Sequence, residues 1–405
     1  MNKKTLSSLL AAALLLASLS ACAKTEQTTT TTPAATTTES SETTPAETEP
    51  SAESETSDAE ASEPEVIENL YSESFKIERL SDGIKRVTDG DGRELILVPR
   101  EQEVPAEYSE SVVVRTPVNN AVFLSSTQVC TFRAVDDAEI VSRIGAVCGG
   151  ADAWTDIPAV AEGLTNGDII DVTGDSGTGE PDYEKIAALE PDVVFVYSGE
   201  YGQQAQMQKF DELGINYAVD NEYLESNYLA RMEWMRFILT FFNADEAVEE
   251  VMSNAQKTVD EAKTAVSDNE PKTIAVFNVF DGTVYATSPD GWFGTMIADM
   301  NGSNVFADMP SNSLTLEAAF DVIRSADVIV YSSTPSWCPG MDAVKEAFPQ
   351  ITECKAYEND NVYQYSELYW LGIDQSDVMA ADIAEVMFPE AFEGRQLSYF
   401  VKLEK

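Results

Sequence analysis

The chain has 405 residues, enough for two domains. Its 71 acidic residues against 25 basic ones give a formal net charge of −46, which excludes nucleic-acid binding because that requires a basic face. It contains no histidine, so a Ser-His-Asp or Cys-His catalytic set cannot exist, and a histidine-rich zinc or manganese site is disfavoured. We therefore expect no enzyme and no cofactor.

Residues 1–22 are typical of an export signal. Lys3 and Lys4 precede an apolar run over residues 9–19, which is too short for a retained anchor helix. Leu19-Ser20-Ala21-Cys22 resembles a bacterial lipobox, which implies cleavage before Cys22 and lipid on its thiol. Acyl chains partition into a bilayer at ~0.8 kcal/mol per methylene, so the sequence predicts a protein anchored to the outer face of the cell membrane.

Residues 23–66 consist largely of Thr, Ser, Glu, Ala and Pro and predict a disordered tether, because they offer almost nothing apolar to bury. The alternation that follows predicts strands over residues 75–80, 84–87 and 95–98, a small N-terminal β extension. Asp89-Gly90-Asp91-Gly92 predicts a hairpin turn between the last two. A calcium loop is the alternative, but the distal ligands of an EF-hand are not at the right spacing.

The first lobe, residues 67–226 including the extension, is expected to begin with a strand over 112–115 and a loop-to-helix passage over 116–126. Strands over 193–197 and 215–219 follow, with a helix over 204–213 that Gly214 ends. Residues 227–268 predict one long connecting helix with a potential interruption at Asn243-Ala244-Asp245, in which Trp234 is expected to pack in the core. The second lobe spans residues 269–405.

The most informative feature is a repeated unit, at residues 182–198 and again at 315–332. Each copy has a helix-capping residue, a Glu two positions later, a short helix, a turn with Asp, a buried β run and then Tyr-Ser. The sequence thus predicts an α/β fold of two similar three-layer lobes with parallel-type sheets. Ligands of open α/β sheets bind beyond the carboxyl ends of the strands, so Tyr197-Ser198-Gly199 and Tyr331-Ser332-Ser333 should face each other across a cleft.

The predicted cleft is aromatic, which suits a large planar ligand held by stacking and apolar burial. The ligand-binding candidates lie in loops at or after strand ends: Trp154, Tyr197, Ser198, Tyr201, Trp292, Phe293, Ser333, Trp337, Tyr369 and Trp370. Only Arg133 and Arg143 offer positive charge nearby. Strongly anionic ferric catecholates are therefore disfavoured, and neutral or cationic complexes or corrinoids are favoured.

Four cysteines remain besides Cys22. An exported protein permits disulfides, and Cys130–Cys148 and Cys338–Cys354 are the favoured pairs because each stays within one lobe. A loop of that length would add about 3 kcal/mol of stability. Four buried thiols are the alternative, and the absence of Cys-x-x-Cys spacing argues against a metal cluster.

Over residues 112–388 the chain resembles the solute-binding lipoproteins of bacterial ABC importers, in the branch with a rigid helix between the lobes that takes up iron–siderophore complexes, haem and cobalamin. The motifs are Leu189-Glu190-Pro191-Asp192, Arg231-Met232-Glu233-Trp234, the run from Met296 to Gly302, and Glu317 with Ala326-Asp327. The resemblance implies that Glu184 and Glu317 dock on arginines of the permease. A purely structural role is the alternative, because a first-turn Glu stabilises its helix by about 0.3–1 kcal/mol.

The resemblance further implies a monomer that captures an iron complex, either a siderophore or haem, and delivers it to the transmembrane subunits of an ABC permease. Tyr197 or Tyr201 would meet a haem. A corrinoid ligand is one alternative, and a ligand sensor that does not transport is another. Lobe closure is expected to be small because a helix between the lobes resists bending.

Overall fold

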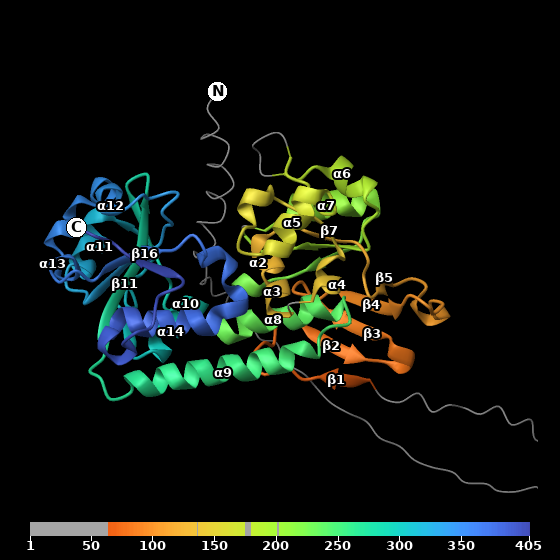
Figure 1. Ribbon diagram of the computed structural model, residues 1–405, viewed down its shortest axis with the longest axis horizontal. Helices are drawn as coiled ribbons and strands as arrows, with labels where there is room; N and C mark the ends of the chain where they lie inside the picture. Colours follow the sequence, from red (N-terminus) through yellow and green to blue (C-terminus); the bar gives the residue numbers. More distant parts are fainter. Residues whose placement is uncertain (1–63, 136, 175–179, 201) are drawn as a thin grey trace, which may run out of the picture.

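The computed structural model describes residues 64–135, 137–174, 180–200 and 202–405. The signal segment with Cys22, the predicted tether up to residue 63, and Tyr201 lie outside the described residues. Figure 1 shows the described chain as an N-terminal sheet and a first lobe on one side, a second lobe on the other, and a long helix, α9, beneath both.

The N-terminal sheet has the strand order β1-β2-β3-β4-β5. Its strands are β1 (Glu65–Ile67), β2 (Lys76–Arg79), β3 (Lys85–Thr88), β4 (Glu94–Pro99) and β5 (Val112–Thr116). The predicted hairpin is confirmed, because β3 and β4 pair antiparallel on either side of the Asp89-Gly90-Asp91-Gly92 turn. Residues 112–115 form a strand as predicted, but β5 pairs parallel with β4 in the N-terminal sheet and does not join the first-lobe sheet. Alternation identifies a strand but not its partner.

The first lobe is built on a parallel sheet of order β10-β9-β6-β7-β8. Its strands are β6 (Ala121–Phe123), β7 (Ile144–Val147), β8 (Ile170–Asp171), β9 (Val193–Val196) and β10 (Tyr217–Val219), and its helices are α2 (Ser126–Val129), α3 (Thr131–Val135), α4 (Ala138–Val141), α5 (Pro158–Asn166), α6 (Tyr183–Ala188) and α7 (Gln204–Leu213). The central strand β6 lies where a loop-to-helix passage was expected. Three residues buried on both faces are too few to show a period.

The second lobe is built on a sheet of order β14-β12-β11-β15-β16-β17, with β13 also paired to β11. Its strands are β11 (Lys272–Phe280), β12 (Thr283–Ala286), β13 (Gly302–Asn304), β14 (Ser313–Thr315), β15 (Val328–Tyr331), β16 (Val362–Tyr365) and β17 (Phe400–Lys402), and its helices are α10 (Trp292–Asp299), α11 (Leu316–Ile323), α12 (Met341–Ala347), α13 (Lys355–Glu358) and α14 (Ser376–Met387). Buried side chains line both faces of this sheet and of the first-lobe sheet, so each lobe has the expected three layers.

The sequence repeat corresponds to one structural unit in each lobe, α6 to β9 and α11 to β15. Asp192, before β9, accepts hydrogen bonds from the backbone N–H groups of Asn119 (2.7 Å) and Asn120 (3.2 Å) at the start of β6. Asp327, before β15, accepts one from the N–H of Thr273 (2.9 Å) in β11. Both lobes therefore contain an equivalent strand, preceded by an equivalent carboxylate. In each lobe this carboxylate binds the backbone of the adjacent strand.

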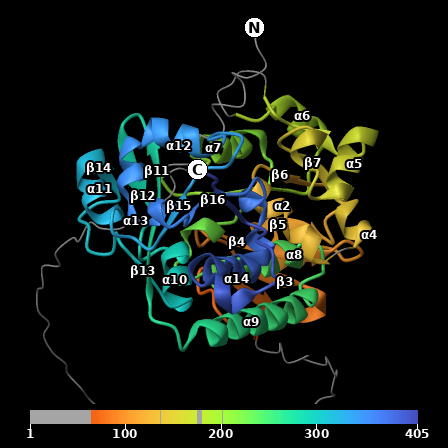
Figure 2. The same ribbon diagram turned by 60° about the vertical axis from the view of Figure 1, so that its left-hand side comes forward.

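The connector is two helices, α8 (Tyr228–Thr240) and α9 (Ala247–Val266), so a single long helix is a wrong prediction. The chain breaks at the interruption that the sequence suggested, where Asn243 adopts a positive φ of 56°. Every residue of α8 is buried, whereas α9 has an exposed face. Helix α9 runs under both lobes, and α14 packs along it (Figures 1 and 2).

One hydrophobic core is shared by the two lobes. It joins Phe123 and Phe195 of the first lobe with Ile274 and Tyr365 of the second, and includes Met252 of α9. Smaller cores cover the outer face of each lobe sheet. The lobes are therefore fused along the connector rather than joined by a flexible linker.

Cys130, Cys148, Cys338 and Cys354 are free thiols, so neither predicted disulfide is formed. Cys130 lies in the shared core, whereas Cys148 packs against the outer-face core of the first lobe, so the sheet separates the two. Cys338 and Cys354 lie in one core, where the Cys354 thiol donates to the carbonyl of Gln350. Burial raises the pKa of Cys338 to about 11 and that of Cys354 to about 12.

Candidate functional site

The carboxyl ends of the two lobe sheets meet. Helix α2, which follows β6, contacts a 3₁₀ turn (Tyr369–Leu371) that follows β16. Beside this contact, Arg133 of α3 donates from Nε (3.0 Å) and Nη2 (2.6 Å) to the carboxylate of Asp374 in the second lobe. A ligand site of an open α/β sheet is expected at this edge.

A buried polar cluster lies at this edge, made of Asp220, Glu222, Gln128 and Arg231, and is called the Asp220 cluster below. Asp220 and Glu222 follow β10, Gln128 belongs to α2, and Arg231 belongs to α8. All four side chains are at least nine-tenths buried. Arg231 Nε donates to Glu222 Oε2. The N–H of Glu222 donates to Asp220 Oδ1 (3.3 Å), and the N–H of Asp220 donates to the carbonyl of Val196 (2.8 Å).

One acceptor of the Asp220 cluster has no partner among the described residues. The Gln128 Nε2 group donates to the carbonyl of Val196 (3.4 Å), but its Oε1 atom has no partner among the described residues. Burial, followed by the neighbouring carboxylate of Glu222, raises the pKa of Asp220 well above its usual range. The cluster thus holds two carboxyl groups against one guanidinium.

Aromatic rings of the second lobe face this cluster. The Arg231 guanidinium stacks over the ring of Trp292, with Cζ 4.2 Å from the ring centroid. The Trp292 ring lies 6.5 Å from that of Tyr369, which in turn stacks on Tyr365 at 3.5 Å. Arg231 therefore connects a first-lobe carboxylate to a second-lobe indole.

Three of the predicted ligand-binding residues are core side chains. Trp154, Phe293 and Tyr369 are each exposed by 5% or less and belong to the shared core. The Trp154 indole is 2% exposed and lies against Gly149. These residues can shape a site but are not open to a ligand in this structure.

Other candidates lie nearer the surface. Tyr197, Trp292, Ser333 and Trp370 are half-buried, and Trp337 is 44% exposed. The sequence reasoning missed two apolar side chains at strand-end turns, Phe280 (60% exposed) and Leu224 (56% exposed). Phe280 precedes an Asp281-Gly282 turn at the carboxyl end of β11. Asp-Gly favours a turn, so the sequence could have indicated an exposed end of the strand here.

Ser198 has a structural role. Its backbone N–H donates to Asn221 Oδ1 (2.9 Å), its hydroxyl accepts from Asn221 Nδ2 (2.8 Å), and the hydroxyl also bonds Asp91. Gly90, in the same turn, donates to the carbonyl of Val219 (2.9 Å). The hairpin turn of the N-terminal sheet therefore covers the carboxyl ends of β9 and β10.

Glu184 and Glu317 occupy equivalent positions in the two lobes. Both are exposed and lie in the first turn of a helix. Asp182 caps α6 by accepting from the N–H of Lys185 (3.0 Å), and Thr315 caps α11 by accepting from the N–H of Ala318 (3.2 Å). Neither glutamate takes part in an ion pair within the described parts of the chain.

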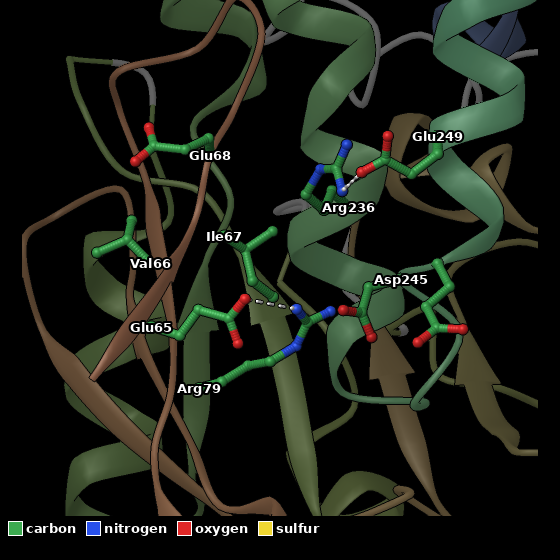
Figure 3. A pocket seen from close by; sticks show the side chains of 9 residues that line it. Glu65, Val66, Ile67, Glu68, Arg79, Arg236, Asp245 and Glu249 are labelled. Carbon is green, nitrogen blue, oxygen red and sulfur yellow. Dashed lines mark hydrogen bonds and ion pairs between the residues drawn. The ribbon is translucent and has the colours of Figure 1, made fainter. Parts of the chain in front are cut away.

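A separate cavity of about 460 Å³ lies between β1 and the turn from α8 to α9 (Figure 3). Two ion pairs lie within it: Arg79 with Glu65 at 3.6 Å, and Arg236 with Glu249 at 3.2 Å. It lies away from the strand ends, so we do not assign the ligand to it. Among residues 64–135, 137–174, 180–200 and 202–405, no group of three or more acidic or cysteine residues could hold a metal, and no helix is long and apolar enough to cross a membrane.

Comparison with known proteins gives a consistent result. A family model described as periplasmic binding protein matches residues 136–368, more than half of the chain. The chain is 29% identical over 330 residues to an uncharacterised lipoprotein of Methanocaldococcus jannaschii, MJ0878, covering 78% of this chain and 77% of that protein. The N-terminal sheet precedes the matched region.

Two solved structures share the fold. The TroA-like periplasmic binding protein FepB of Veillonella parvula matches with a TM-score of 0.54 and 16% identity, over 79% of this chain and 99% of that one. A periplasmic heme binding protein of Pseudomonas aeruginosa matches with a TM-score of 0.54 and 10% identity, over 71% of this chain and 99% of that one. At these identities the likeness establishes the fold alone.

Proposed function

Because this chain belongs to the periplasmic binding protein family, we propose that it is an extracytoplasmic, lipid-anchored solute-binding protein that delivers an iron complex to an ABC permease. The observation that carries the proposal is the meeting of strand-end segments from two similar lobes, at α2 and the turn Tyr369–Leu371. The lipoprotein relative and the structural neighbour described as a periplasmic heme binding protein support it. A corrinoid remains the second candidate ligand.

A thermal-shift screen of the purified full chain tests the ligand class. The probes are haem, cobalamin, and neutral, cationic and anionic ferric chelates. A ligand present at 100 times its dissociation constant adds about 2.7 kcal/mol to the free energy of unfolding, which gives a clear rise in Tm. A rise with iron complexes supports the proposal, a rise with cobalamin alone transfers it to corrinoids, and no rise with any probe argues for a sensor or another solute.

We further propose that Glu184 and Glu317 are the permease contacts. The double variant Glu184→Ala/Glu317→Ala should bind ligand as tightly as the unmodified protein, because both side chains are exposed on the outer helices, yet it should support no uptake in cells. The matched control is Glu162→Ala/Glu346→Ala, which removes one exposed glutamate from each lobe elsewhere. Normal uptake by the first double variant would contradict the assignment.

A further inference from the structure

The chain enters its folded part on the connector side of the molecule. The described residues begin at Pro64, which leads directly into β1, and Ile67 of β1 belongs to the shared core together with Met252 of α9. Shortly after β1, the buried carboxylate of Glu233 in α8 accepts hydrogen bonds from the N–H groups of residues 70–72. The point of chain entry is therefore fixed beside the connector (Figure 1).

The two docking candidates lie across the lobe sheets from the connector. Glu184 is in the first turn of α6, whose Ile186 belongs to the outer-face core of the first lobe. Glu317 is in the first turn of α11, whose Ile323 belongs to the outer-face core of the second lobe. Figures 1 and 2 show α6 on the opposite side of the first-lobe sheet from α9. A permease that contacts these glutamates would thus lie away from the point of chain entry.

The distance between the two sides can be compared with the length of chain before Pro64. A compact body of about 340 residues has a radius of gyration of about 20 Å, and hence a diameter of about 50 Å and a path of about 80 Å around its surface. Since a chain spans at most about 3.4 Å per residue, roughly 15–24 residues are needed to reach the other side. Residues 23–63 supply about 40, which is sufficient.

We propose that the length of residues 23–63 is a requirement for docking, because it lets Glu184 and Glu317 turn toward the permease while lipid on Cys22 stays in the membrane. This inference rests on the lipid-anchored, permease-docking function proposed above. A linker shorter than the span between two sites gives an effective concentration near zero, whereas a longer one lowers that concentration only gradually. Docking should therefore show a threshold in length and little dependence on sequence.

Orientation at a membrane tests the geometry without ligand or permease. The full lipidated chain is bound to phosphatidylcholine vesicles with nitroxide-labelled headgroups, and a fluorophore is attached through Ala187→Cys on α6 or Ser253→Cys on α9, both exposed positions. Both labels should be quenched. Deletion of residues 29–58 leaves about 11 residues with a reach of about 37 Å, so quenching on α6 should fall at least about fivefold while quenching on α9 remains.

Uptake by cells tests the functional consequence, with radiolabelled haem, cobalamin and a ferric trihydroxamate chelate as probes. Deletion of residues 29–58 should lower uptake at least about tenfold, although the purified variant keeps its thermal shift. The matched control, deletion of residues 34–43, leaves a reach of about 105 Å and should keep uptake within about twofold. A Gly/Ser segment of equal length in place of residues 29–58 should restore uptake. Membrane fractionation confirms that every variant is anchored.

Three results would overturn the inference and leave the proposed function intact. They are unchanged quenching on α6 after deletion of residues 29–58, full uptake by that variant, and failure of the Gly/Ser segment to restore uptake. Absence of uptake of every probe by the unmodified chain would instead overturn the delivery function, and the length requirement with it.

Discussion

At the scale of single residues, the aspartates of the two repeats show how one side chain can hold the start of a neighbouring strand in place. Asp192 accepts from the two N–H groups just before β6, and Asp327 accepts from the second N–H group of β11. Each also binds a base, Arg100 and Lys355 respectively. The N–H groups at the start of a strand need a partner that the neighbouring strands do not supply. The carboxylate therefore fixes where β6 and β11 begin.

The pH dependence of stability tests this role for Asp327. Burial alone would raise its pKa, but hydrogen bonds from the Lys355 ammonium and from the Thr273 N–H and hydroxyl outweigh burial and lower the pKa to about 2. Because the folded value lies below the unfolded one of about 3.9, this stabilisation is fully present above the unfolded pKa and is lost as the pH falls toward 2.

We therefore expect Asp327→Asn to lower the free energy of unfolding at pH 7 by about 1–2 kcal/mol, after allowing for partial solvent screening, and by much less near pH 2. Urea titrations at several pH values measure the difference. Asp342→Asn, which removes a fully solvated carboxylate from α12, is the control. An equal loss of stability at both pH extremes would show that the ionised form of Asp327 is not the source.

Most residue identities of the candidate site could not be read from the sequence. Aromatic residues after strand ends are an ambiguous signal, because the same side chains fill a core when a second lobe packs over them, as for Phe293 and Tyr369. Asp220 and Glu222 gave no signal, since acids are common throughout this chain. Their significance comes from burial beside Gln128 and Arg231, which only the fold determines.

At the scale of elements, α8 is the most constrained helix. The carboxylate of Glu233, with no exposed surface, accepts hydrogen bonds from three successive N–H groups, those of Leu70 (2.7 Å), Tyr71 (2.8 Å) and Ser72 (3.0 Å). The segment between β1 and β2 is thereby fixed to the connector. Phe75 adds an aromatic contact to Trp234 at 4.8 Å.

Two glutamates that share one arginine provide a matched comparison. Arg236 lies 3.9 Å from buried Glu233 and 3.2 Å from Glu249, whose side chain is 70% exposed. Glu233→Gln should cost about 2–3 kcal/mol of unfolding free energy, because it weakens several charge-assisted hydrogen bonds in a buried site. Glu249→Gln should cost less than about 0.5 kcal/mol.

Chemical denaturation of both variants measures the two costs. Similar losses would show that the Leu70–Ser72 segment is not held by Glu233. Circular dichroism of the folded variants controls for loss of helix.

The elements themselves were largely predictable, and their partners were not. The strand over 193–197, the helix over 204–213 and the hairpin at Asp89–Gly92 follow from local pattern and turn chemistry. The connector divides near Asn243, which adopts a left-handed conformation. The sequence pattern alone does not decide whether an Asn at this position continues the helix or ends it. The partner of β5 and the existence of β6 required contacts distant in sequence.

At the scale of the whole molecule, the shared core limits the motion of the lobes. Residues from both lobe sheets, α8, α9 and α14 pack in one cluster, and Arg133 and Asp374 bridge the lobes at its edge. Close-packed interfaces resist continuous deformation. Large hinge closure would break these contacts.

Small-angle X-ray scattering tests this rigidity. We expect the radius of gyration of the full chain to be unchanged within error between the free protein and the protein saturated with a ligand from the thermal-shift screen. Arg133→Ala, which removes the bridge between the lobes, should allow a measurable ligand-dependent change. A clear contraction of the unmodified protein on binding would contradict the expectation.

The shared core also bears on how such a protein can change over evolutionary time. Phe195 of the first lobe and Ile274 of the second belong to the same core. Exchange of a whole lobe with a relative would therefore combine two halves of a core that have not adapted to each other. Cores tolerate substitution when volume and pattern are kept together. New specificities are therefore more accessible through the surface turns at the strand ends, such as that of Phe280, than through recombination of lobes.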